Sequence, residues 1–163
     1  MELHEIRQRL DAFARLKGFE VKDPYYIWGE FKLTTPDGDV LYTDEGLLWC
    51  KECAEAAVSK ALSLLPEEER DAHRLNRADV SSGEDTPAQC FKCHADLDYL
   101  LTDWGVRNEL EHFEDEPPSG PYVNLAWWIA RLIESAEGTE HEEAAKRLGR
   151  AMLEKVEAAQ CQP

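Results

Sequence analysis

Two Cys-x-x-Cys pairs constrain this chain more than any other feature of its sequence. The first pair is Cys50 and Cys53, and the second is Cys90 and Cys93. The spacing within each pair lets both sulfurs reach one ion, and four thiolates complete a tetrahedral site. Zinc is the usual occupant, because it accepts sulfur ligands and has no redox chemistry of its own. The pattern therefore predicts a closed structural zinc site with no coordination position left for a substrate.

Three other interpretations of the cysteines stay open. Mononuclear iron would occupy the same four-sulfur cage. A dithiol redox site would use Cys50 and Cys53 at the start of a helix, where a thiol pKa falls, but it leaves the second pair without a role. Covalent haem would use the Cys-x-x-Cys-His match that ends at His94, but it leaves the first pair without a role.

Three residues are further candidate ligands. His94 follows Cys93 directly, and it would either bind the metal, donate a hydrogen bond to a bound sulfur or simply cap the turn. We favour the turn. We interpret His112 as a surface residue and Cys161 as a free thiol in the tail. The predicted metal ligands are therefore Cys50, Cys53, Cys90 and Cys93.

These four cysteines and the elements expected around them resemble the zinc-knuckle modules of zinc-ribbon and treble-clef type in small bacterial and phage proteins. The similarity covers residues 47–106. The residue after each knuckle, which is usually small in such modules, is Ala54 at the first and His94 at the second. The resemblance implies a zinc-held module and no particular activity.

Apolar periodicity predicts helices at both ends of the chain and one between the cysteine pairs. Residues 2–17 carry apolar side chains at steps of three and four, as do residues 54–65. Residues 25–33 and 40–42 predict a β-hairpin, because Pro36 and Gly38 between them favour a turn.

The last third of the chain is less regular. Residues 97–106 fit either a helix or a strand and turn, and residues 111–121 predict a linker. A broad apolar helix follows, and Thr139 to Glu142 match a capping box at the start of the final helix. We predict an α+β fold and one domain over residues 1–163, in which a small β-hairpin and zinc-knuckle region is flanked by an N-terminal helix and a C-terminal helical pair. The zinc module occupies residues 47–106 and the helical pair residues 119–160.

Acidic residues exceed basic ones by a wide margin. The formal net charge of the 163 residues is −16, which argues against direct binding to nucleic acid. Between residues 96 and 116, Arg107 is the only basic residue, so this stretch carries a net charge of −7. We favour a plain solvated face, and the alternative is a surface for a basic protein partner, which makes its residues candidate partner-binding residues. Its acidic residues are Asp96, Asp98, Asp103, Glu109, Glu111, Glu114, Asp115 and Glu116.

Motifs of common enzyme classes are absent from the sequence. It has no Gly-rich phosphate loop, no Gly-x-Ser-x-Gly elbow and no His-Glu-x-x-His. We therefore predict a non-enzymatic, zinc-stabilised acidic protein that binds another protein. One alternative is a nucleic-acid mimic that inhibits a DNA- or RNA-processing or defence complex, and another is a thiol redox protein using Cys50 and Cys53. The sequence shows no secretory leader and no membrane-spanning run, so we expect a cytoplasmic protein with reduced thiols.

Overall fold

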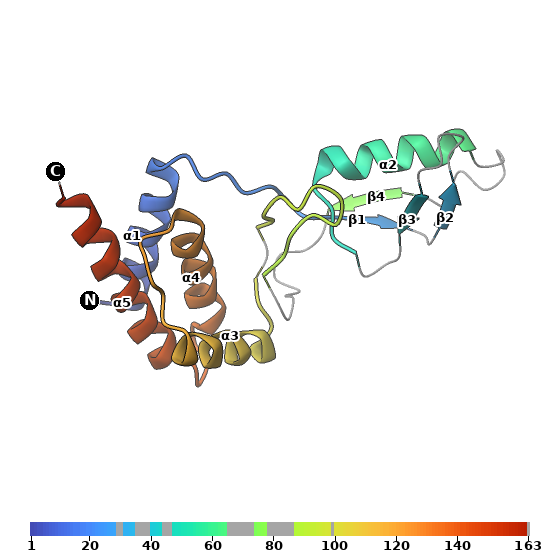
Figure 1. Ribbon diagram of the computed structural model, residues 1–163. Helices are drawn as coiled ribbons and strands as arrows, with labels where there is room; N and C mark the ends of the chain where they lie inside the picture. The colour runs from blue at the N-terminus through green and yellow to red at the C-terminus, as the bar shows by residue number, and fades with distance from the viewer. Residues whose placement is uncertain are drawn as a thin grey trace. The chain divides into compact units, whose positions relative to one another are not determined.

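The computed structural model describes residues 1–28, 31–34, 40–43, 47–64, 74–77, 87–98 and 100–162. Contacts divide the chain into two compact units, and Figure 1 labels their elements. Unit 1 comprises Met1–Glu20, Ser81–Pro87 and Tyr99–Pro163, and unit 2 comprises Val21–Val80 and Ala88–Asp98. This grouping of contacts does not test whether residues 1–163 fold and unfold together as a single domain, so the single domain stays a prediction.

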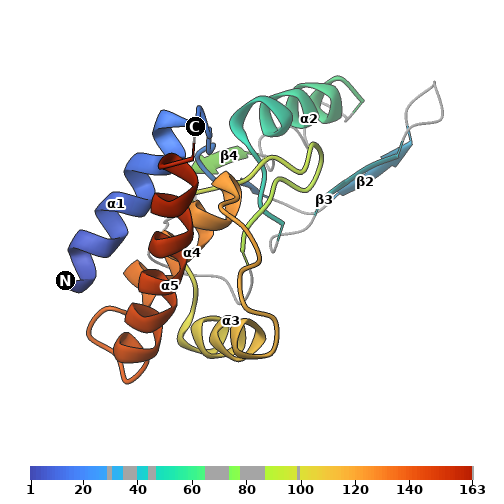
Figure 2. The same ribbon diagram turned by 60° about the vertical axis from the view of Figure 1, so that its left-hand side comes forward.

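Unit 1 is helical throughout its described elements. It contains α1 (Leu3–Leu16), α3 (Asp103–Asp115), α4 (Val123–Ala136) and α5 (Glu142–Gln160). The central helix is α4, which packs against each of the other three. Figure 1 and Figure 2 both show α1, α4 and α5 side by side. Each helix buries its apolar stripe on its neighbours, as an amphipathic helix must when no sheet covers it.

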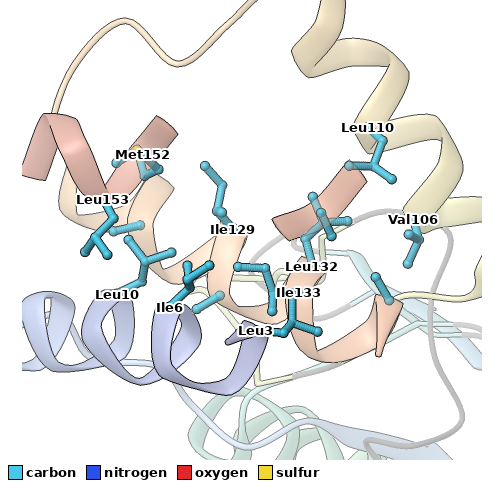
Figure 3. Close-up of a cluster of buried hydrophobic side chains, with 14 of the residues drawn as sticks. Leu3, Ile6, Leu10, Val106, Leu110, Ile129, Leu132, Ile133, Met152 and Leu153 are labelled. Atoms are coloured by element: carbon cyan, nitrogen blue, oxygen red, sulfur yellow. The ribbon is translucent and has the colours of Figure 1, made fainter. Parts of the chain in front are cut away.

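The core of unit 1 is continuous across the four helices. Figure 3 shows its aliphatic side chains meeting between α1, α4 and α5, with α3 adding Val106 and Leu110. Ile6, Leu10, Ile129 and Met152 are completely buried. The whole buried cluster contains Leu3, Ile6, Leu10, Phe13, Leu101, Val106, Leu110, Ala126, Ile129, Ala130, Leu132, Ile133, Ala136, Ala145, Met152, Leu153 and Val156.

Two polar details fix how these helices meet. Arg131 on α4 is only 11% exposed at its side chain and donates to both carboxylate oxygens of Asp11 on α1, at 3.0 and 2.9 Å. Its guanidinium also lies 4.3 Å from the centre of the Trp127 ring. Gly149 on α5 allows close packing, because a Cβ there would lie 2.6 Å from Cδ1 of Ile133 and 2.8 Å from Cγ2 of Ile6.

Unit 2 combines one helix with short strand pairs. The strand β1 (Tyr25–Trp28) pairs antiparallel with β4 (Arg74–Arg77), and β2 (Phe31–Thr34) pairs antiparallel with β3 (Val40–Thr43). The helix α2 (Lys51–Leu64) follows Cys50 directly. A small described core of Ile27, Trp49, Ala54 and Ala57 lies between α2 and β1.

The predicted α+β class is wrong. Helices dominate the described residues, and the apolar stripes of the four helices of unit 1 bury against one another rather than against a sheet. The strands form two separate two-stranded ladders, so no common β layer organises the fold. Within unit 1, the N-terminal helix α1 packs against α4 and α5. The turn predicted at residues 35–39 lies outside the described residues.

Two local predictions also differ from the structure. The linker expected at residues 111–121 begins later, because α3 continues to Asp115. At the start of α3, Thr102 Oγ1 accepts a capping hydrogen bond from the Gly105 amide at 3.1 Å. The capping box expected at residues 139–142 is displaced by one position. Thr139 Oγ1 accepts from the His141 amide at 3.1 Å, and Glu142 Oε2 accepts from the Gly138 amide at 2.8 Å. The final helix therefore begins at Glu142.

No helix in the part of the chain that the structure describes is long and apolar enough to cross a membrane.

Candidate metal centre

Backbone hydrogen bonds from three segments build the framework of the cysteine site. The Tyr25 amide donates to the Trp49 carbonyl at 2.8 Å, and the Trp49 amide donates back to the Tyr25 carbonyl at 2.9 Å. One residue away, the Phe91 amide donates to the Leu48 carbonyl at 2.9 Å. The rings of Trp49 and Phe91 meet edge to face, with centroids 5.1 Å apart. The segment before the first cysteine pair is thus held against the segment that carries the second pair.

A third segment completes the framework from the N-terminal side. The Lys22 amide donates to the Asp96 carbonyl, and the Asp98 amide donates to the Lys22 carbonyl, both at 2.9 Å. These bonds fix the chain that leaves the second cysteine pair.

The four predicted ligands come together in this framework. The sulfurs of Cys50, Cys53, Cys90 and Cys93 all lie within 4.8 Å of one another. The Cys50 and Cys93 sulfurs are 3.8 Å apart. A tetrahedron with zinc–sulfur bonds of about 2.3 Å has edges of about 3.8 Å, so this separation is the one that a four-sulfur site needs. The described cluster has no histidine or carboxylate among its members.

The two pairs are presented differently. Cys50 immediately precedes α2 and Cys53 lies in its first turn, where the Ala54 amide donates to the Cys50 carbonyl at 3.0 Å. Cys90 and Cys93 lie in a tight turn closed by two backbone bonds. The His94 amide donates to the Cys90 carbonyl at 2.9 Å, and the Cys90 amide donates to the Ala95 carbonyl at 2.8 Å.

His94 has an unusual backbone conformation. Its φ angle of 61° lies in the left-handed region, where glycine is favoured and His is tolerated better than β-branched residues. Its side chain is exposed and does not join the four-sulfur cluster. The residue acts in the structure as the turn position after the second pair.

Burial of the sulfurs is uneven, and burial together with backbone hydrogen bonds shifts the pKa values of three of the four thiols. Cys50 and Cys90 are buried, Cys53 is partly buried and Cys93 is exposed. Burial raises the pKa of the Cys50 thiol and of the Cys53 thiol. Burial acts in the same direction on Cys90, but the backbone amides of Cys93, Cys50 and Lys92 outweigh it and lower the Cys90 pKa to about 7. Metal uptake must therefore displace protons from the first pair.

Lys22 brings a positive charge to the edge of the site. Its Nζ lies 3.4 Å from Oε2 of Glu52, one of the two residues between the cysteines of the first pair. The hydrogen bond to Glu52 and the charge on the Cys50 sulfur raise the pKa of Lys22. Four thiolates around a divalent ion carry a net charge of −2, so a nearby ammonium group stabilises the loaded site. No local sequence signal points to this residue, because it lies far from both pairs along the chain.

The structure separates the acidic residues that the sequence grouped together. Asp96 and Asp98 belong to unit 2 and are partly buried. The other six lie on α3 or at its end in unit 1, where Glu109 is partly buried and the other five are exposed. These five are Asp103, Glu111, Glu114, Asp115 and Glu116.

Sequence reasoning missed one prominent residue of α3. Trp104 leaves 56% of its surface exposed. The sequence placed it among apolar residues of uncertain structure, and only the helical phase of α3 turns it outward.

Comparisons with known proteins add no relative. The chain matches no protein-family model, and no curated protein or solved structure matches it.

Proposed function

We propose that this chain is a non-enzymatic protein that zinc stabilises through Cys50, Cys53, Cys90 and Cys93. The observation that carries the proposal is the convergence of four sulfurs within 4.8 Å, two of them buried. Four thiolates complete the coordination of zinc, so the centre stabilises the fold and has no position for a substrate. Reduced thiols are needed to hold the metal, which suits a cytoplasmic location.

Metal analysis tests this part of the proposal. The protein purified without a tag is expected to carry one zinc and no iron by elemental analysis and native mass spectrometry. Replacing zinc by cobalt should give the sulfur-to-cobalt absorption of a tetrahedral thiolate site. Cys93→Ser should remove that absorption, whereas Cys161→Ser, a matched change of an exposed thiol in the tail, should leave it intact. Iron in place of zinc, or no metal at all, would contradict the assignment.

The redox alternative has less support than the metal site. A reactive dithiol needs a thiol with a lowered pKa, and its two sulfurs must not be engaged by other groups. Instead, burial raises the pKa values of Cys50 and Cys53, and the second pair lies against them. We therefore do not propose a redox function.

The proposed binding surface for a basic protein is one side of α3. Trp104, Asn108, Glu111 and Asp115 are exposed and are spaced by four, three and four residues, which places them along one stripe of the helix. A shallow hollow beside the stripe is lined by Asn108, Glu111, Asp115 and their neighbours. An exposed indole beside carboxylates favours a partner with an apolar pocket bordered by Lys or Arg.

Charge-matched variants test the surface. The protein would be used to capture partners from nuclease-treated lysate, and each captured protein would be identified by mass spectrometry. Trp104→Ala and Glu111→Lys are expected to weaken a specific partner about tenfold or more, since a central aromatic anchor carries much of the energy of an interface. Glu154→Lys, on the exposed side of α5, changes the net charge equally and should have little effect. Equal losses in both lysine variants would show that only net charge matters.

The nucleic-acid mimic is a narrower form of the same proposal. It requires that DNA or RNA displace the captured partner and that binding weaken steeply with salt. A partner that α3 variants release but nucleic acid does not would support the general binding function and exclude the mimic.

A further inference from the structure

A second group of metal-ligating side chains lies in unit 1, within the described residues but apart from the cysteine cluster. It contains Asp103, the first residue of α3, together with Glu140 and His141 in the turn before α5. One oxygen from each carboxylate and one ring nitrogen of His141 lie within 4.8 Å of one another. The group joins the beginnings of α3 and α5, which start 39 residues apart along the chain.

The imidazole of His141 is the unusual member. Its side chain is only 13% exposed, and its Nε2 atom is buried without a hydrogen-bond partner. The closest carboxylate oxygens are Oδ1 of Asp103 at 3.5 Å and Oε1 of Glu140 at 3.7 Å, which is longer than a good hydrogen bond. A buried ring nitrogen without a partner is costly, so this arrangement requires an explanation.

We propose that Asp103, Glu140 and His141 bind a divalent transition-metal ion such as zinc. Imidazole and carboxylate are suitable ligands for zinc, cobalt, nickel and manganese. Ligands about 2.0–2.1 Å from a tetrahedral zinc ion are about 3.4 Å apart, close to the separations of 3.5 and 3.7 Å in this group. Two carboxylates and a neutral imidazole carry a charge of −2, which a divalent ion balances.

The surrounding turn holds the imidazole in place while the carboxylates remain adjustable. The His141 amide donates to Oγ1 of Thr139 at 3.1 Å, and that hydroxyl donates to the Ala136 carbonyl at 2.7 Å. Asp103 and Glu140 are 72% and 83% exposed, so both can rotate by the few tenths of an ångström that coordination needs. The bound ion would connect α3 to the turn between α4 and α5.

This site would differ from the cysteine centre in strength and exchange. It has three protein ligands, of which two are exposed, and no sulfur. We therefore expect an ion that dialysis removes while the four-sulfur metal remains. The ion would stabilise unit 1, because a ligand that binds only the folded state shifts unfolding to higher temperature.

Equilibrium dialysis against zinc tests the proposal. The untagged full chain would carry Cys161→Ser, so that the tail thiol does not bind zinc. The expected result is one zinc that survives dialysis into metal-free buffer and a second that binds reversibly and raises the melting temperature. His141→Ala, Asp103→Asn and Glu140→Gln should each abolish the second zinc and its thermal shift. The exposed carboxylate variants keep the test valid if the histidine variant folds poorly.

His112 supplies the matched control. It lies on α3 with Nε2 4.0 Å from Oε2 of Glu116, so it forms an exposed histidine–carboxylate pair without a third ligand. His112→Ala should keep the second zinc. A stoichiometry of one zinc in the parent protein, or a second zinc that survives His141→Ala, would overturn the proposal. The proposal would also be overturned if zinc left the melting temperature unchanged while pH changed it in the parent protein and not in His141→Ala. A protonated imidazole between two carboxylates would then explain the geometry.

Discussion

Removal of the four-sulfur metal is expected to unfold unit 2 and leave unit 1 folded. The described buried residues of unit 2 include four large apolar side chains, which are Ile27, Leu48, Trp49 and Leu97. Burial of a large apolar side chain contributes about 1.5–3 kcal/mol, whereas a structural zinc site contributes about 10–16 kcal/mol. Four such side chains give about 6–12 kcal/mol, so the metal contributes at least about as much as this apolar core. Unit 1 has 17 buried apolar residues in one cluster and does not contain these cysteines.

The structure gives the size of the expected signal. The helix α2 has 14 residues, while α1, α3, α4 and α5 have 14, 13, 14 and 19. A strong chelator should therefore remove about one fifth of the helical ellipticity, because ellipticity scales with the number of helical residues. Hydrogen exchange read by mass spectrometry should show lost protection in α2 and retained protection in α4. The same chelator already saturated with zinc is the control.

Two results would refute this reasoning. Unchanged ellipticity and unchanged protection of α2 in the metal-free protein would mean that packing alone holds unit 2. Simultaneous loss of all five helices would mean that the units unfold together, and it would support the single domain over residues 1–163 that the sequence predicts.

Three further predictions concern protonation and packing. Zinc affinity should fall as the pH falls, and the slope of log affinity against pH should increase by about one below pH 7. The reason is that zinc must then also displace the proton of the Cys90 thiol, whose pKa is about 7. Competition with a chelator measures this slope, and a constant slope would contradict the prediction. Gly149→Ala should destabilise the protein by about 1 kcal/mol in urea unfolding, since an overpacking cost of about 1–3 kcal/mol exceeds the gain in helix propensity of about 1 kcal/mol. Adding Ile133→Val removes Cδ1 of Ile133, the atom closest to the new methyl group, and should restore part of the lost stability. Asp11→Ala should cost about 3 kcal/mol because it leaves Arg131 largely buried with one fewer carboxylate, whereas Glu5→Ala, in an exposed pair, should cost under about 1 kcal/mol.

Local sequence patterns predicted the elements whose signals are local. The apolar steps of α1 and α2 are regular, and the spacing within each cysteine pair alone predicted a shared metal site. The helix α3 was harder, because Gly105 and the run of acidic residues resemble a break. Its cap at Thr102 is local, but the burial of Val106 depends on α4 and α5, which the sequence pattern does not place.

Long-range pairings account for the rest of the differences. Nothing near β1 indicates that residues 25–28 pair with residues 74–77, almost 50 positions later. The same holds for His141 and Asp103, which the packing of four helices brings together. The fold class was wrong for a related reason: amphipathic helices do not reveal whether their partner is a sheet or another helix, and here α4 supplied the partner.

The uneven burial of the sulfurs affects the rate at which a bound metal is exchanged rather than the equilibrium affinity for it. Competing chelators and electrophiles meet Cys93 first, since Cys50 and Cys90 are closed to solvent. Exchange of a bound metal would thus depend on the access of other ligands to this exposed sulfur. A tightly held ion can in this way still be passed to another molecule at a rate that the accessibility of a single side chain sets.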